Sequence, residues 1–375
     1  MLNMIIELAF VFVFALSMLF LLRKVAKHER IALVDKPNER KFHEGSVPLV
    51  GGLSICLSIL YFLYLEPDIF QYSELYSISI AILVAVGVLD DKFDISVRFR
   101  MLVQAGLALL MINVAGVKLS LLGNLLGVGV IELPVVIDQF ITVLAVIGAI
   151  NAFNMVDGID GLLGGLASVT FAAIGVLFLC QGDYRLAYLC AVFIVVMLPY
   201  ILFNLGFFGR TRKVFMGDAG SMLIGFTVIW LLISISQRAE GQNILRPVTA
   251  LWLIALPLFD MAAIMIRRVR RGDSPFKPDR EHLHHICQRI GLNSRQTLVA
   301  ICSVAFCFAA IGIAGEVLNV PEYIMFYTFM CGFVLYAVML SYIWKVVAKV
   351  RSLMGQPRHA VETCDEKINT SSIQQ

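Results

Sequence analysis

Apolar runs of about 20 residues, long enough to cross the hydrocarbon core of a bilayer as a helix, recur along most of the sequence. Charged or Gly- and Pro-rich segments separate them. Only 15% of the 375 residues are charged and 59% are hydrophobic, whereas an average soluble domain is about 25% charged. A soluble globule of this length needs more polar cover for its surface. The sequence therefore predicts an all-α, polytopic integral membrane protein.

Eleven runs qualify as membrane-spanning helices. Their approximate bounds are residues 4–22, 48–65, 74–89, 100–116, 134–150, 161–180, 185–203, 219–236, 247–266, 297–315 and 322–344. An odd number of spans places the two ends of the chain on opposite sides of the membrane. We predict a single transmembrane domain over residues 1–351, followed by a disordered polar tail over residues 352–375.

The basic residues divide unevenly between alternate loops. Segments 23–47, 90–100, 204–218 and 267–296, together with the part after residue 344, hold 26 of the 30 Lys and Arg residues. Because positively charged loops tend to stay in the cytoplasm, these five segments are predicted to be cytoplasmic. The N-terminus is then periplasmic and the C-terminus cytoplasmic. Nothing in this distribution indicates nucleic-acid binding, and the eight cysteines include no CxxC pair typical of a metal site.

Three aspartates lie at the predicted cytoplasmic end of the third run. Asp90 and Asp94 are four residues apart, on one face of a helix end, and Asp91 lies beside them. Carboxylates this close repel one another, which favours a bound cation or a shifted pKa. Mg²⁺ prefers oxygen ligands of this kind. An ordinary polar helix terminus is the alternative interpretation.

A second polar strip follows the fifth run. Asn151, Asn154, Asp157 and Asp160 recur at every third residue and are accompanied by glycines. This spacing keeps the four side chains close together in a helix or a 3₁₀ turn, and glycine lets a ligand approach the backbone. Helix packing alone does not account for such a strip, which is therefore a candidate binding surface.

The segment from Asn204 to Ser221 combines three cations, the aromatic Phe215 and the lone Asp218 just before the eighth run. The start of a helix favours anions, because its backbone N–H groups are free and the helix dipole is positive there. An aspartate beside a phosphate would be repelled unless a metal ion lay between them. Asp218 is therefore a candidate metal ligand, with a simple helix cap as the alternative.

The loop from Arg267 to Arg295 is long and basic, and it contains Arg280, His282, His284 and His285. Arginine binds phosphate oxygens through forked donors, and histidine adds donors or positive charge near neutral pH. Zinc binding by the histidines is less favoured, because no cysteine lies at a ligand spacing. A purely topogenic role for the arginines is an alternative that does not explain the histidines.

Together, these motifs indicate a cytoplasmic, cation-rich cleft that suits Mg²⁺ and two phosphorylated partners. Two phosphates repel each other, and bringing them into line requires a metal ion together with Arg, Lys or His donors. Because the cleft lies at the membrane face, one partner is expected to be a lipid phosphate. Residues 35–45 add a further basic segment, for which attraction to anionic membrane lipids is an equal alternative.

At these motifs the sequence resembles the polyprenyl-phosphate N-acetylhexosamine-1-phosphate transferases. The matching strings are DKPNERKFHEG, PLVGG, LDDKFDIS, INAFNMVDGIDGLLGG, KVFMGDAGS, PVTALW and SPFKPDREHLHH. The resemblance implies transfer of GlcNAc-1-phosphate from UDP-GlcNAc to undecaprenyl phosphate, with release of UMP and with Mg²⁺, or Mn²⁺, as cofactor. It also implies a bacterial inner-membrane location with a cytoplasmic active site, a role in starting O antigen and enterobacterial common antigen, and sensitivity to tunicamycin.

The resemblance also implies roles for individual residues. The catalytic acids of the family match Asp90, Asp91, Asp157 and Asp160. Its metal site matches Asp218 and Asn154. Its nucleotide-sugar contacts match Asn204, Phe215, His282, His284, His285 and Arg280, with Phe215 as a stacking platform for uracil.

The sugar is expected to be GlcNAc, although another UDP-N-acetylhexosamine or UDP-MurNAc-pentapeptide remains an alternative. The relative that transfers phospho-MurNAc-pentapeptide has three adjacent histidines and a shorter loop before its metal-binding aspartate. In this chain Leu283 interrupts the histidines, and residues Gly209–Lys213 lengthen that loop. Both differences favour GlcNAc.

Two other classes of protein deserve comparison. A membrane prenyltransferase could use Asp90, Asp91 and Asp94 as a diphosphate-binding motif, but it would need a second aspartate-rich helix. A transporter would place ionisable residues near the middle of the membrane, whereas these acids lie at helix ends. Asp260 is the nearest exception, and it could instead support the neighbouring loop. The sequence leaves open whether the chain forms a homodimer.

Overall fold

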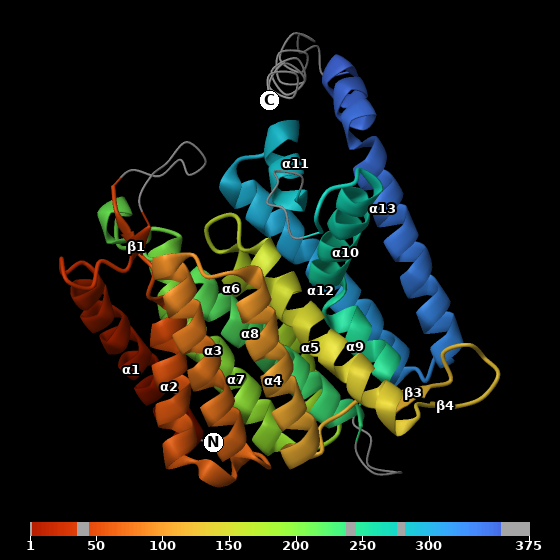
Figure 1. Ribbon diagram of the computed structural model, residues 1–375, viewed down its shortest axis with the longest axis horizontal. Coiled ribbons are helices and arrows are strands. Elements are labelled where there is room, and N and C mark those ends of the chain that lie inside the picture. The colour runs from red at the N-terminus through yellow and green to blue at the C-terminus, as the bar shows by residue number, and fades with distance from the viewer. Residues whose placement is uncertain (1, 36–44, 238–244, 276–281, 354–375) are drawn as a thin grey trace.

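The computed structural model describes residues 2–35, 45–237, 245–275 and 282–353, and these are mostly helical (Figure 1). Within them, nine helices are long and apolar enough to cross a membrane, and a tenth span results if one sharply bent pair of helices is counted together. The predicted class, a polytopic helical membrane protein, is confirmed.

Most of the predicted runs correspond to single helices. These are α1 (Leu2–Ala26), α3 (Ser73–Phe93), α4 (Val97–Ala115), α5 (Val135–Val156), α6 (Leu162–Cys180), α7 (Tyr184–Asn204), α8 (Gly217–Ser236), α12 (Ser294–Val317) and α13 (Glu322–Leu353). The run at 48–65 forms α2 (Gly51–Leu65), whose 15 residues fall short of the usual spanning length. The described helices therefore support nine or ten spans rather than the expected eleven.

The remaining elements are short. Strands β1 (Val34–Asp35) and β2 (Val47–Pro48) pair antiparallel, as do β3 (Leu121–Gly123) and β4 (Ile131–Glu132). Two 3₁₀ turns cover Pro67–Ile69 and Arg210–Arg212. The basic loop contains an additional helix, α11 (Leu283–Ile290). This eight-residue helix is too short to stand out as an apolar run in the sequence.

The prediction of one continuous helix over 247–266 is wrong. The chain forms α9 (Pro247–Leu253) and α10 (Ala255–Arg270), which are bent by 80° relative to each other. Pro257 explains the break, because its ring clashes with the carbonyl of the residue four positions earlier, Leu253, and it has no N–H to donate. The Leu253 carbonyl instead accepts a hydrogen bond from the Thr170 hydroxyl at 3.3 Å.

Helix α8 lies at the centre of the bundle, with α3 and α5 beside it (Figure 1). Of its most apolar 18 residues, 94% are buried. Glycines bring its backbone into direct contact with three neighbours. A Cβ atom on Gly52 of α2 would lie 2.2 Å from the Cα of Gly220, and one on Gly87 of α3 would lie 2.3 Å from the Cα of Ala219. A Cβ on Gly225 would lie 2.6 Å from the Cα of Ile150 in α5.

Small residues at helix contacts are typical of membrane proteins, where association depends on close packing. Here they bring the last turns of α3 and α5 against the first turn of α8 at one end of the bundle. In Figure 1, α1 starts at the lower end of the bundle and α13 ends at its upper end. These two ends of the described chain therefore lie at opposite ends of the bundle.

Replacing Gly87 with Leu should destabilise the protein, because α3 and α8 would have to separate. Overpacking of a tight contact costs about 1–3 kcal/mol. The matched control is Gly106→Leu in α4, where a Cβ atom meets nothing within 4 Å. Thermal unfolding in detergent should give a clearly lower melting temperature for Gly87→Leu than for the control. Equal melting temperatures would contradict the account of this contact.

Candidate active site

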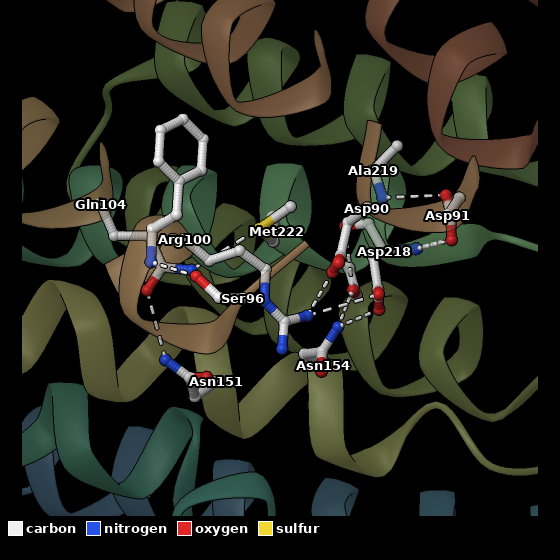
Figure 2. A network of polar contacts seen from close by, with 12 residues as sticks. Asp90, Asp91, Ser96, Arg100, Gln104, Asn151, Asn154, Asp218, Ala219 and Met222 are labelled. Atoms are coloured by element: carbon white, nitrogen blue, oxygen red, sulfur yellow. Dashed lines mark hydrogen bonds and ion pairs between the residues drawn. The ribbon is translucent and has the colours of Figure 1, made fainter. Parts of the chain in front are cut away.

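The first turn of α8 is built around an unusual glycine. Gly217 has a φ of +73°, a conformation that L side chains rarely adopt, and a Cβ atom there would lie 2.3 Å from the Asp91 carboxylate. The space is filled by that carboxylate, which accepts hydrogen bonds from the backbone N–H groups of Asp218 at 2.9 Å and Ala219 at 3.5 Å (Figure 2). Asp91, predicted to be catalytic, therefore caps the start of α8.

Asp90 has a different partner. Its carboxylate is buried and forms an ion pair with the Arg100 guanidinium, which also lies 3.4 Å from Asp218 (Figure 2). Asp94 ends α3 as an exposed residue with a left-handed φ of 51°. The prediction that Asp90, Asp91 and Asp94 form one carboxylate cluster is therefore wrong, because the side chain of Asp94 is exposed and lies outside the network. Asp90 instead joins Asp218 through Arg100.

Arg100 is a site residue that the sequence interpretation missed, because it counted only as one of many basic residues. It lies in the first turn of α4, where a cation opposes the positive end of the helix dipole. That unfavourable position was the available signal that Arg100 has a specific acidic partner.

Asn154 joins α5 to α8. Its side-chain amide donates hydrogen bonds to the Asp218 carboxylate at 2.6 Å and to the Ser221 hydroxyl at 2.7 Å (Figure 2). One turn earlier, Asn151 donates to the Gln104 side chain at 3.3 Å. Asn154 and Asp218, which the resemblance assigns to one metal site, are thus in direct contact. Asp218 keeps 36% of its side chain exposed. Its carboxylate is accessible from outside the bundle.

The second half of the strip continues past the end of α5. Asp157 follows the last residue of that helix, and no described residue forms a hydrogen bond with its carboxylate. Burial, together with the nearby Asp218, Asp91 and Asp160 carboxylates, raises the pKa of Asp157 to about 7. A concentration of negative charge this close to Asp218 suits a cationic ligand.

The first predicted nucleoside contact, Asn204, lies beside the strip. Asn204 is buried; its side chain accepts a hydrogen bond from the Gly161 N–H and donates one to the Val214 carbonyl at 2.9 Å. It therefore braces two loops, and its contact with a nucleoside stays a prediction. Close by, Lys213 forms an ion pair with Asp160.

Phe215, the second predicted nucleoside contact, lies just before α8. Its backbone N–H donates to the Pro48 carbonyl, and its carbonyl accepts from the Gly51 N–H, both at 2.9 Å. These bonds tie the segment before α8 to the start of α2. The stacking role predicted for the half-buried ring is not tested by these contacts.

The histidine segment also contacts the strip. His282 is hydrogen-bonded to Asp260 at 2.8 Å, and the rings of His284 and His285 are 4.1 Å apart. His284 packs on Gly158, where a Cβ atom would lie 2.1 Å from its Nε2 atom. Burial and the two neighbouring histidines lower the pKa of His284 to about 3, so its ring is neutral at physiological pH.

Three predicted regions lie wholly or partly outside the described residues. They are Arg280, most of the basic segment at 35–45, and the tail from residue 354 onward. For the rest, the structure brings Asp90, Asp91, Asn154 and Asp218 into one network and places His284 against the adjoining strip.

A sequence profile of glycosyl transferase family 4 matches residues 74–236, which contain this network. The chain belongs to that family. Relatives that match most of its length also show this. It is 47% identical over 357 residues to the undecaprenyl-phosphate alpha-N-acetylglucosaminyl 1-phosphate transferase of Salmonella typhimurium, covering 95% of this chain and 96% of the relative. The protein of the same name from Yersinia pestis is 46% identical, with coverage of 96% and 98%. That of Haemophilus influenzae is 51% identical, with coverage of 86% and 90%.

The raised pKa of Asp157 predicts a specific pH dependence of stability. Between about pH 4, the usual pKa of an aspartate, and pH 7, the folded protein holds a proton that the unfolded chain has lost, so folding loses stability as the pH rises. Asp157→Asn removes this loss. In metal-free buffer, the melting temperature of the variant relative to wild type should therefore increase from pH 5 to pH 8. A difference independent of pH would contradict the assignment.

Proposed function

We propose that this chain transfers GlcNAc-1-phosphate from UDP-GlcNAc to undecaprenyl phosphate, giving undecaprenyl-diphospho-GlcNAc and UMP. One observation carries the proposal: nearly full-length relatives, 46–51% identical, bear the name of this phosphotransferase. The geometry supports it, because an accessible aspartate lies among Asn154, Arg100 and Asp157 at the ends of apolar helices. A lipid phosphate and a soluble nucleotide-sugar can both reach such a position.

In this reaction an oxygen of the lipid phosphate attacks the β-phosphorus of UDP-GlcNAc. The bond from that phosphorus to the oxygen bridging the two phosphates breaks, UMP leaves with that oxygen, and the bond between sugar and phosphate stays intact. A phosphomonoester is mostly dianionic at neutral pH, since its second pKa is about 6. The acceptor therefore needs little help from a general base.

The partners of the two acids at the end of α3 support direct attack by the lipid phosphate over a covalent aspartyl-phosphate intermediate. Asp90 is held by Arg100, and Asp91 is held by the first backbone N–H groups of α8. Neither carboxylate is free to act as a nucleophile in this arrangement. We propose that Asp90 positions Arg100 and that Asp91 positions Asp218. Asp157 and Asp160 would supply negative charge that attracts a cation to the strip.

The residues present fit a magnesium ion, for which Mn²⁺ could substitute. Mg²⁺ typically uses one or two carboxylates and completes its shell with water and substrate phosphates. Asp218, whose side chain is 36% exposed, with Asn154 beside it, provides this kind of partial site. Among the described residues no three His, Cys, Asp or Glu side chains form a metal cage. When bound, the ion would neutralise charge on the diphosphate.

We further propose eleven spans within a single catalytic domain over residues 1–351, with α2 as a short span. At 1.5 Å per residue its 15 residues extend about 22 Å. The charge bias of 26 in 30 basic residues supports a periplasmic N-terminus, a cytoplasmic C-terminus and a cytoplasmic active site in the bacterial inner membrane. The product would then serve the start of O antigen and enterobacterial common antigen.

The proposal is tested with purified protein, undecaprenyl phosphate and Mg²⁺, by measuring UMP release from separate UDP-sugars. UDP-GlcNAc should be used at least tenfold better than UDP-GalNAc or UDP-MurNAc-pentapeptide. If UMP is released only from UDP-MurNAc-pentapeptide, the assignment of GlcNAc as the transferred sugar is wrong. No release with any UDP-sugar would overturn the proposed function.

Asp218→Asn should lower UMP release by at least about 100-fold, because one charge-stabilising group at a phosphoryl-transfer centre is worth about that much. Melting temperature should change little, since Asn154 can still bond the amide oxygen. Asp68→Asn is the matched control, because Asp68 is exposed and remote from the network. Wild-type rates in Asp218→Asn would contradict the metal assignment.

A further inference from the structure

Asp260, a buried aspartate outside the network around Asp218, connects three helices. Its carboxylate is 2% exposed and accepts hydrogen bonds from His282 at 2.8 Å, from the Leu283 N–H at 3.1 Å and from the Tyr336 hydroxyl at 2.7 Å. These donors belong to the start of α11 and to α13, whereas Asp260 belongs to α10. One carboxylate therefore fixes where α11 begins and how it is oriented.

The orientation of α11 decides where His284 points. The rings of His282 and His284 lie parallel, with an interplanar angle of 9° and centroids 5.8 Å apart. His284 is 3% exposed, and its Nε2 atom is buried against Gly158 with no hydrogen-bond partner among the described residues. An unpaired buried polar atom is costly. Its position beside the strip that contains Asp157 makes it a candidate contact for a ligand bound there.

We propose that Asp260 and Tyr336 are positioning residues that hold α11 so that His284 faces the sugar-nucleotide at Gly158. The inference rests on the proposed function for the identity of that ligand. Both residues lie outside the segment 74–236 matched by the family profile, so the last helix of the bundle contributes to a site formed mainly by earlier ones.

The packing around Tyr336 needs an aromatic ring but no hydroxyl. Phe329 and Phe333, also on α13, already contact the ring of Phe259 at centroid distances of 4.8 and 5.5 Å, and Tyr336 adds a third contact at 6.0 Å. A buried hydroxyl is unfavourable unless it is hydrogen-bonded. Its presence at this position is explained by the bond to Asp260.

Tyr336→Phe tests the proposal, because it removes the hydroxyl and keeps the ring. The KM for UDP-GlcNAc should rise about two- to tenfold, the range for loss of one hydrogen bond, while the KM for undecaprenyl phosphate and the melting temperature stay near wild type. The matched control is Tyr327→Phe on the exposed part of α13. Equal increases in both KM values, or no increase, would overturn the proposal.

A double variant tests whether Tyr336 acts through the histidine. In a His284→Ala background, Tyr336→Phe should have little further effect on the KM for UDP-GlcNAc, because the group that it positions is already gone. Multiplying effects of the two substitutions would show that Tyr336 acts independently of His284, and would overturn the proposal.

A measurement without substrate separates failure of this inference from failure of the proposed function. Diethyl pyrocarbonate should modify the buried His284 slowly in the wild-type chain. In Asp260→Asn and Tyr336→Phe the rate should rise severalfold, because α11 is no longer held. Unchanged rates in both variants would overturn the positioning role even if UMP is released. Faster rates would support it even if the wild-type chain releases no UMP.

Discussion

Direct contact between the backbone of α8 and those of α2, α3 and α5 is the constraint on which the site depends. Glycines at 52, 87 and 225 remove the side chains that would hold these helices apart. The end of α3 and the end of α5 then lie within hydrogen-bond distance of the first turn of α8. Polar groups are expensive inside a bilayer, and this arrangement gathers them at one end of the bundle, where they bond to one another.

Some charged groups of the site bond to other protein groups, and others remain available to a ligand. Asp91 caps α8, Asp90 holds Arg100, and Lys213 balances Asp160. Asp218 is partly exposed. Within the described residues, the Asp157 carboxylate has no hydrogen bond and the His284 Nε2 atom has no partner. Carboxylates near a neutral histidine suit a diphosphate that binds together with a cation. The cation would offset the negative charges of the carboxylates and of the diphosphate.

The apolar runs predicted the helices well, because length and hydropathy are local properties of the chain. The resemblance to the transferase family, and not the residue spacing, predicted that Asn154 and Asp218 belong to one site. The pattern could not show that Asn204 braces two loops, that Asp94 turns away, or that Arg100 pairs with Asp90, because these facts depend on how helices rotate against each other. Likewise, Pro257 breaks a run that is apolar apart from Thr249 and Asp260. The bond between Asp260 and Tyr336 spans 76 residues.

The central claim is that the ends of these helices form a centre that moves a sugar-phosphate from a nucleotide to a lipid phosphate. The most direct measurement follows UDP-GlcNAc labelled with ³²P at the β-phosphate, incubated with the purified chain, undecaprenyl phosphate and Mg²⁺. The account predicts that all transferred label appears in the lipid product and that the released UMP is unlabelled. Label in the nucleotide product, or label released as GlcNAc-1-phosphate without transfer to lipid, would contradict it.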